Sequence, residues 1–189
     1  MPNPDRAAAA LAIQAFLQAI GRDPAEPDLV GTGARVADAY IDELCAGYAI
    51  DTRELLRTNV IRATSPGLVV VRDVPIATTC PHHLLSATGT ATIALHSRDK
   101  IVGLGALTAL ADAHARRLTL QERIGDGIVA DVADVLSPAW VGCRVVLSHA
   151  CMVVRGGKTV GASVETVSLW GARAPDEVAH VHAVLGVGA

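Results

Sequence analysis

The sequence contains very few aromatic residues. Phe, Trp and Tyr together make up 3% of its 189 residues. A platform on which nucleic-acid bases could stack needs exposed aromatic rings, so this composition argues against one. The formal net charge of −3 provides no positive field that would draw the chain to nucleic acid or to an anionic membrane. We therefore expect neither nucleic acid nor a membrane among its partners.

Long apolar runs are also missing, and no stretch is long enough to cross a bilayer. The segment AAAALAIQAFLQAI is interrupted by Gln14 and Gln18, and it lacks the basic start and the cleavage site of a signal peptide. We therefore expect a cytoplasmic protein, in which the four cysteines are thiols or metal ligands rather than disulfides. Hydrophobic residues make up 51% and charged residues 19%, which is typical of a folded globular chain.

The order of the predicted elements indicates an α+β fold with mostly antiparallel strands, because it lacks the regular alternation of a doubly wound sheet. Residues 68–79, 88–97, 140–154 and 159–169 are predicted strands, the last two joined by the turn RGGK into a hairpin. Residues 5–20, 32–47, 105–117, 119–136 and a short stretch from Pro175 are predicted helices. Pro75 marks a bulge or a sheet edge. We expect one domain, residues 1–189, with a helical part (1–60), a central part (61–174) and a tail (175–189).

Four residues that can bind a metal occur in two pairs. Cys80 and His83 are three positions apart, and a tight turn after a strand can bring both to one ion. His149 and Cys151 are two apart on a predicted strand, so they point to the same face. Two cysteines and one histidine with an open fourth position form a catalytic zinc pattern, whereas His149 as a fourth ligand would close a structural site. Spacing alone does not separate these two alternatives.

The alternative without a metal is that each of these residues is structural. An isolated cysteine is usually a small buried hydrophobe. We expect this role for Cys45, in a predicted helix, and for Cys143, in a predicted strand, because neither has a ligand-type neighbour. His82, next to His83, raises the ligand density of the CPHH segment and favours the metal site there.

The combination of CPHH, QER about forty residues later and HACMVVRG resembles the GTP cyclohydrolase I family. The family pattern is C-E-H-H, then Q-E-R on a helix, then H-x-C-x-x-x-R-G. The likeness extends from about Thr32 to Trp170. It implies a tunnelling fold in the central part of the chain, with a four-stranded antiparallel sheet and two helices on one side. It also implies a homo-oligomer, in which subunits join into a ring, two rings stack as a decamer, and active sites lie between subunits.

The resemblance also implies a zinc-dependent hydrolase that acts on a cyclic amidine C–N bond of a purine. Zinc lowers the pKa of a bound water toward about 7, and water attacks C8 of the imidazole ring. A histidine suits the proton transfers that open the ring. The implied roles are zinc ligation by Cys80, His83 and Cys151, catalysis by His149 and His82, guanine recognition by Gln121 and Glu122, and phosphate binding by Arg155 and Arg35. Without the resemblance, Gln121 and Glu122 would be interpreted as a solvated helix face.

The sequence departs from the family pattern at the residues that hold the triphosphate. Gly105, Ala106 and Ala109 stand where the family has Ser, Lys and Arg, and Asp38 stands where it has another Lys. Pro81 replaces the Glu of C-E-H-H. Each charge-assisted contact with a phosphate contributes on the order of 1.5–3 kcal/mol. Losing three such contacts should therefore weaken triphosphate binding considerably.

These departures favour a substrate without the triphosphate, such as guanine, 8-oxoguanine or a nucleoside, whose imidazole ring is opened at C8. The first alternative is an ordinary GTP cyclohydrolase I that converts GTP to 7,8-dihydroneopterin triphosphate and formate. It would need other cations, and Arg98, Lys100, Arg116 and Lys158 are available. Two further alternatives are a non-catalytic ring protein that binds a purine and a protein with a closed structural zinc site.

Overall fold

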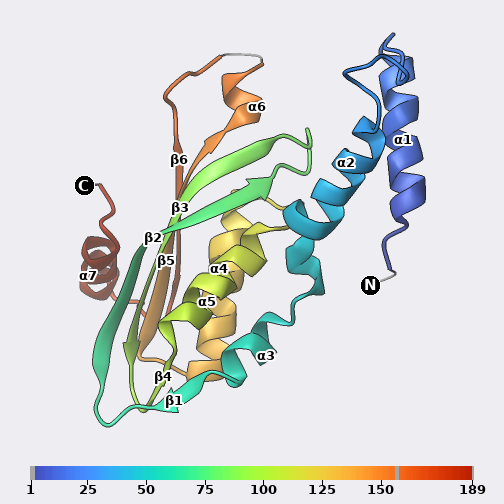
Figure 1. Ribbon diagram of the computed structural model, residues 1–189. Helices are drawn as coiled ribbons and strands as arrows, with labels where there is room; N and C mark the ends of the chain where they lie inside the picture. The colour runs from blue at the N-terminus through green and yellow to red at the C-terminus, as the bar shows by residue number, and fades with distance from the viewer. Residues whose placement is uncertain (1–2, 156–157, 189) are drawn as a thin grey trace. The chain divides into compact units, whose positions relative to one another are not determined.

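The computed structural model describes residues 3–155 and 158–188 (Figure 1). The chain divides into two compact units, one that ends at Ala46 and one that begins at Gly47. We predicted one domain with three parts. Whether the two units fold together as one domain stays a prediction. No helix among the described residues is both long enough and apolar enough to cross a membrane.

The first unit is helical, as predicted. Helix α1 (Arg6–Ala19) begins where the Asp5 carboxylate accepts a hydrogen bond from the Ala8 amide, which satisfies a free N–H group of the first turn. Helix α2 (Thr32–Asp38) packs against α1 so closely that a Cβ on Gly33 would lie 2.5 Å from the Ala10 carbonyl oxygen. The helix predicted to continue to residue 47 changes pitch, because Ala39–Leu44 form a π-helix (η1) and Ala46–Ala49 a 3₁₀ turn (η2).

The second unit is built on a four-stranded antiparallel sheet with the strand order β2-β3-β5-β6. The strands are β2 (Gly67–Thr79), β3 (Ser86–Ser97), β5 (Trp140–His149) and β6 (Val164–Trp170). Two short strands, β1 (Val60–Arg62) and β4 (Lys100–Val102), form a separate antiparallel pair. The strand prediction missed this pair, because three residues are too few for a detectable alternation.

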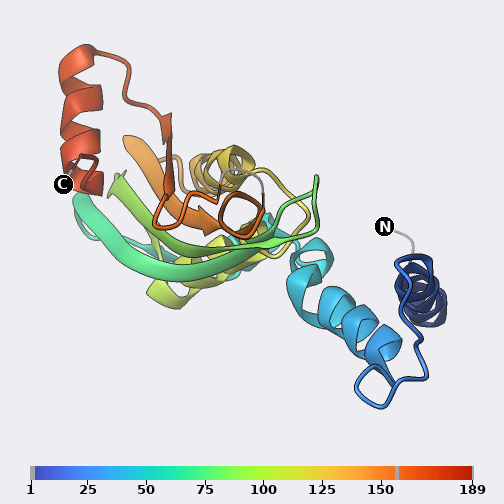
Figure 2. The same ribbon diagram turned by 90° about the horizontal axis from the view of Figure 1, so that it is seen from above.

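Two helices cover one face of this sheet, α4 (Leu104–Ala115) and α5 (Gln121–Leu136) (Figures 1 and 2). Their apolar side chains form the main core with alternate residues of the strands, among them Ile93, Val145 and Leu147. A short helix, α3 (Thr52–Arg57), contacts both α4 and α5. The predicted α+β architecture, an antiparallel sheet with two helices on one side, is therefore confirmed.

The other face of the sheet is partly covered by α7 (Pro175–Leu185), which the sequence predicted only as a short C-terminal helix (Figure 2). Val181 and Leu185 of this helix are buried in a second, smaller apolar cluster with Ala94. Gly142 makes this close approach possible, because a Cβ there would lie 2.9 Å from a methyl carbon of Val181. The tail thus contributes to the fold of the second unit.

Two details of the strand prediction need correction. The strand predicted over 140–154 ends at His149, which pairs with Ala87 one residue from the start of β3. Ala150–Val153 then form a helical turn, α6. Strands β5 and β6 pair antiparallel, but α6 and a loop connect them instead of a tight turn, and residues 156–157 of RGGK lie outside the described residues. The prediction from Pro75 is confirmed, because β2 is an edge strand, and the strand also has a bulge between Val71 and Val74.

Candidate active site and metal centre

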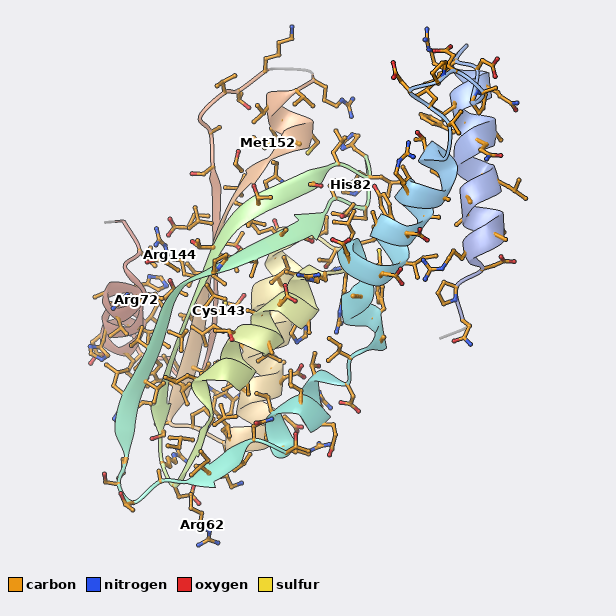
Figure 3. All side chains as sticks on the ribbon, in the orientation of Figure 1. Arg62, Arg72, His82, Cys143, Arg144 and Met152 are labelled. Atoms are coloured by element: carbon orange, nitrogen blue, oxygen red, sulfur yellow. The ribbon has the colours of Figure 1, made fainter. Side chains whose placement is uncertain are left out.

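The CPHH segment forms the loop between β2 and β3. The Cys80 amide donates to the Leu85 carbonyl and the Leu84 amide donates to the Cys80 carbonyl, each at 2.9 Å. Leu84 adopts a positive φ of 53°, which lets the chain reverse within six residues. The loop therefore holds Cys80, His82 and His83 at one end of the sheet. Figure 3 labels His82 there.

Cys80, His83 and Cys151 come together as the sequence predicted. One ligand atom from each lies within 4.8 Å of the other two, and no other group of three such residues occurs within 3–155 and 158–188. In tetrahedral zinc sites, ligand atoms 2.0–2.3 Å from the metal lie about 3.3–3.8 Å apart, so small rotamer changes suffice. The donor set of two thiols and one imidazole therefore fits zinc. His149 and His82 are not members of this cluster.

Cys151 lies on an element that the sequence did not predict. It lies on α6, so the argument that His149 and Cys151 share one face of a strand is wrong. Burial and the neighbouring Cys80 raise the pKa of the Cys151 thiol, while the positive charge of Arg155 opposes this rise. A bound cation would favour both thiolates, as metal ligation requires.

The two other histidines lie beside the cluster. The Nδ1 atoms of His82 and His83 are 3.9 and 3.8 Å from the Cys80 sulfur, and the two rings meet edge to face. His149 Nε2 is 2.8 Å from the Oε1 atom of Gln121. The amide nitrogen of Gln121 donates in turn to the backbone carbonyls of Val145 and Val164.

These residues line one pocket of about 240 Å³. Seven of the nine predicted site residues line it: Cys80, His82, His83, Gln121, Glu122, His149 and Cys151. Gln121 is buried, whereas Glu122, the next residue of α5, is exposed and available to a ligand. The motifs did not identify Thr78, Thr119, Leu120, Met152 and Val164 as lining residues. Four of them are within two positions of a motif residue, which could have indicated them: Thr78 before Cys80, Thr119 and Leu120 before Gln121, and Met152 after Cys151.

The two arginines predicted to bind phosphate do not line this pocket. Arg155 is exposed and follows α6, near enough to influence the Cys151 thiol. Arg35 belongs to the first unit, where its guanidinium donates to the Val30 carbonyl and the Thr32 hydroxyl at 2.9 Å. Asp38, in the same unit, forms an ion pair with Arg6.

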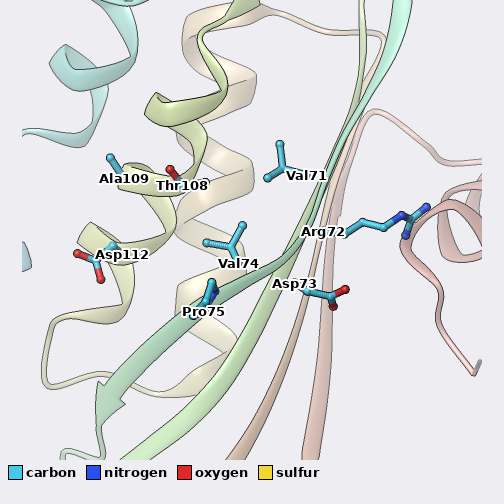
Figure 4. Close-up of a pocket in the computed structure, with 8 residues that line it drawn as sticks. All are labelled: Val71, Arg72, Asp73, Val74, Pro75, Thr108, Ala109 and Asp112. Carbon is cyan, nitrogen blue, oxygen red and sulfur yellow. The ribbon is translucent and has the colours of Figure 1, made fainter.

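The positions that carry the family's Ser, Lys and Arg lie on α4, outside the pocket lining. Ala109 instead lines a separate open groove of about 490 Å³ between α4 and the bulge of β2 (Figure 4). Val71 and Val74 point toward α4, while Arg72 and Asp73 project on the opposite side of the strand (Figure 4). Asp112 of this groove forms an ion pair with Arg116. Arg116, one of the four cations named above as available for phosphate binding, therefore already has a carboxylate partner.

The two remaining cysteines are not members of the cluster. Cys143 is fully buried in the main core, and burial followed by the nearby Asp126 raises its pKa to about 12. This confirms the predicted core role of Cys143. Cys45 is only partly buried, and that burial raises its pKa.

Comparisons with known proteins agree with these motifs. The family described as GTP cyclohydrolase I matches residues 9–185. "GTP cyclohydrolase 1" of Leptospira biflexa is 36% identical over 84% of this chain and 86% of its own length. The proteins of the same name from a Synechococcus strain and from Chlorobium phaeovibrioides are 34% and 35% identical, over 85% and 84% of this chain and 69% and 71% of their own lengths.

Among solved structures, the archaeosine synthase QueF-Like in the apo form superimposes with a TM-score of 0.45 at 18% identity, over 59% of this chain and 100% of that one. The family match extends over nearly the whole chain and includes every motif of the pocket. The chain therefore belongs to the GTP cyclohydrolase I family of hydrolases, which act on a cyclic amidine C–N bond.

Proposed function

We propose that this protein is a zinc-dependent hydrolase that opens the imidazole ring of GTP at C8, giving 7,8-dihydroneopterin triphosphate and formate. The observation that carries this proposal is one pocket in which Cys80, His83 and Cys151 converge beside the pair His149–Gln121. The relatives' shared name favours GTP over the unphosphorylated purine that the sequence analysis preferred.

Cys80, His83 and Cys151 would hold the zinc, which when bound makes a water molecule acidic enough to act as a nucleophile near neutral pH. His149 lines the pocket without belonging to the ligand cluster, so it remains free to exchange a proton with the ring nitrogens. His82 lies beside Cys80 and would assist this transfer.

Glu122 is the residue best placed to recognise the base. Its exposed carboxylate lines the pocket and can accept hydrogen bonds from N1–H and the 2-amino group of guanine. A purine that lacks these donors would leave the carboxylate unpaired, and a site of this kind rejects such analogues strongly. Glu122 thus provides specificity for guanine over adenine.

A second candidate function is the opening of an unphosphorylated guanine-type purine. The specific observation in its favour is the chemistry of the phosphate positions, because Gly105, Ala106 and Ala109 of α4 carry no charge and Asp38 is acidic and paired with Arg6. If GTP is the substrate, as in the first proposal, Arg155 and Arg35 bind the phosphates together with other cations, such as Arg98, Lys100 and Lys158.

A turnover panel separates these candidates. Zinc-loaded protein is incubated with GTP, guanosine, guanine or 8-oxoguanine, while purine absorbance and pterin fluorescence are followed. Conversion of GTP to a fluorescent pterin supports the first proposal. Loss of a base or nucleoside with GTP untouched supports the second, and no turnover of any purine by protein with bound zinc contradicts both.

We also propose that the protein works as a homo-oligomeric ring, as a decamer with sites between subunits. Two observations support assembly. Strands β2 and β6 are the edges of the sheet, and an unprotected edge invites pairing with another chain. Helix α1 exposes the large apolar side chains of Leu11 and Phe16, and Ile20 at its C-cap is exposed as well. Sedimentation analysis of the intact protein tests this, and a monomer at micromolar concentration would contradict it.

A further inference from the structure

The orientation of the Gln121 amide is determined by its surroundings. Its nitrogen lies 3.0 Å from the Val145 carbonyl oxygen and 2.8 Å from the Val164 carbonyl oxygen. Carbonyl oxygens can only accept hydrogen bonds, so the NH₂ group must face them and the amide cannot be flipped. The Thr166 hydroxyl is a third, longer contact at 3.3 Å.

This orientation places the Oε1 atom of Gln121 against His149 Nε2 at 2.8 Å. An amide oxygen only accepts, so Nε2 must be the nitrogen that carries the proton. In a neutral imidazole the other nitrogen, Nδ1, is then an unprotonated acceptor. The carbonyl groups of β5 and β6 thus orient the Gln121 amide, and the Gln121 amide in turn selects one tautomer of His149.

The same contacts leave Gln121 little capacity to bind a ligand. Both N–H groups are used by backbone carbonyls, and only 4% of the residue is exposed. It is the first residue of α5 and is bonded to β5 and β6, so three elements restrict its movement. Glu122, next in sequence, is the member of the pair that faces the pocket freely.

We propose that Gln121 is a positioning residue that holds His149 with its proton on Nε2 and leaves Nδ1 to exchange a proton with the purine, instead of recognising the base itself. The catalytic part of this inference rests on the proposed function. The tautomer part does not, because it concerns the protein without substrate.

The first test is spectroscopic and needs no substituted Gln121. Zinc-loaded protein labelled with ¹⁵N-histidine is examined by long-range ¹H–¹⁵N correlation, and the His149 signals are assigned by their loss in His149→Asn. At a pH at which the ring carries a single proton, that proton is expected on Nε2. A ring protonated on Nδ1, or a mixture of both tautomers, would overturn the proposal whatever substrate the enzyme uses.

The second test uses Gln121→Met, which has a similar length but neither donates nor accepts strongly, on whichever purine is turned over. We expect kcat to fall by about 10- to 100-fold with KM changed less than about 2-fold, because transition-state interactions are lost and ground-state binding is kept. Adding this change to His149→Ala should cost no further activity. A higher KM with kcat unchanged would instead mean that Gln121 binds the base.

Ser168→Ala is the matched control, because Ser168 also bonds β6 to α5, through Asp126 at 2.6 Å, without contacting His149. It should leave both the tautomer and kcat unchanged. If Gln121→Met does not fold, the wild-type spectrum still decides the proposal. A correct tautomer in a protein that turns over no purine would retain the inference about Gln121 and contradict the proposed function.

Discussion

His114 on α4 and Asp131 on α5 form a buried hydrogen-bonded pair, with His114 Nε2 2.8 Å from the Asp131 Oδ2 atom. The same carboxylate accepts from the Thr52 hydroxyl at 2.6 Å and from Arg53 Nε at 3.0 Å. Asp131 therefore joins α3, α4 and α5 beneath the sheet. A buried carboxylate needs such donors, since burial without them costs several kcal/mol.

The Asp131 cluster should make stability depend on acid pH. Burial alone would raise the pKa of Asp131, but hydrogen bonds from His114, Thr52 and Arg53 outweigh it and lower the pKa to about 2. Because the folded pKa lies below the unfolded value, the stabilisation is present above about pH 4 and is lost as pH falls toward 2. It amounts to about 2 kcal/mol.

Urea unfolding of the wild type and Asp131→Asn at several pH values tests this expectation. The difference in unfolding free energy should be largest near neutral pH and should shrink as the pH falls below about 4. An equal difference at all pH values would show that the carboxylate charge does not contribute.

Gly127→Ala should destabilise the protein at the same cluster. A Cβ at position 127 would lie 2.5 Å from two atoms of the His114 ring, so the ring would have to leave Asp131. We expect a loss of about 1–3 kcal/mol of unfolding free energy, as for other overpacked cores. Gly105→Ala is the control in the neighbouring helix, because nothing lies within 4 Å of its Cβ position. It should gain about 0.5–1 kcal/mol from the better helix propensity. The unfolding free energies of both variants are measured by chemical denaturation. Equal changes in Gly127→Ala and Gly105→Ala would contradict this packing argument.

Cys80→Ala should abolish zinc binding, because it removes one of the three clustered ligands. Elemental analysis after dialysis should find about one zinc per chain in the wild type and almost none in the variant. Cys45→Ala, whose thiol lies in the first unit, should retain the metal. His149→Ala should also retain it, since His149 is outside the cluster, but kcat should fall by at least about 100-fold. Loss of zinc from His149→Ala would indicate a closed site with four protein ligands.

Glu122→Gln should impair the recognition of guanine. The amide keeps the shape of the side chain but loses the charge that strengthens its hydrogen bonds, so kcat/KM should fall by roughly 10- to 100-fold. Asp134→Asn, an exposed position on the same helix, should leave kcat/KM unchanged. Steady-state kinetics with the substrate found in the turnover panel provide the comparison. Similar losses in both variants would mean that general charge, not base recognition, is responsible.

Local patterns predicted most of the secondary structure. The alternation of residues 88–97 and the apolar spacing of 105–136 correspond to β3, α4 and α5 within a few residues. The prediction failed where pairing partners decide the conformation. Residues 150–153 have strand-like composition, yet pairing with β3 stops at His149, close to the start of β3, and they form a helical turn.

Residue types at short spacings were enough to predict the metal-binding and histidine side chains of the site. The motifs CPHH, QER and HACMVVRG identified the ligand cluster and the family, because each depends on residue types at short spacings. How these residues are arranged depends on the tertiary structure. It placed Cys151 on α6, turned Gln121 toward His149 and put Ala109 in a different groove. These relationships depend on hydrogen bonds and packing between elements that are distant in the chain, which no local pattern contains.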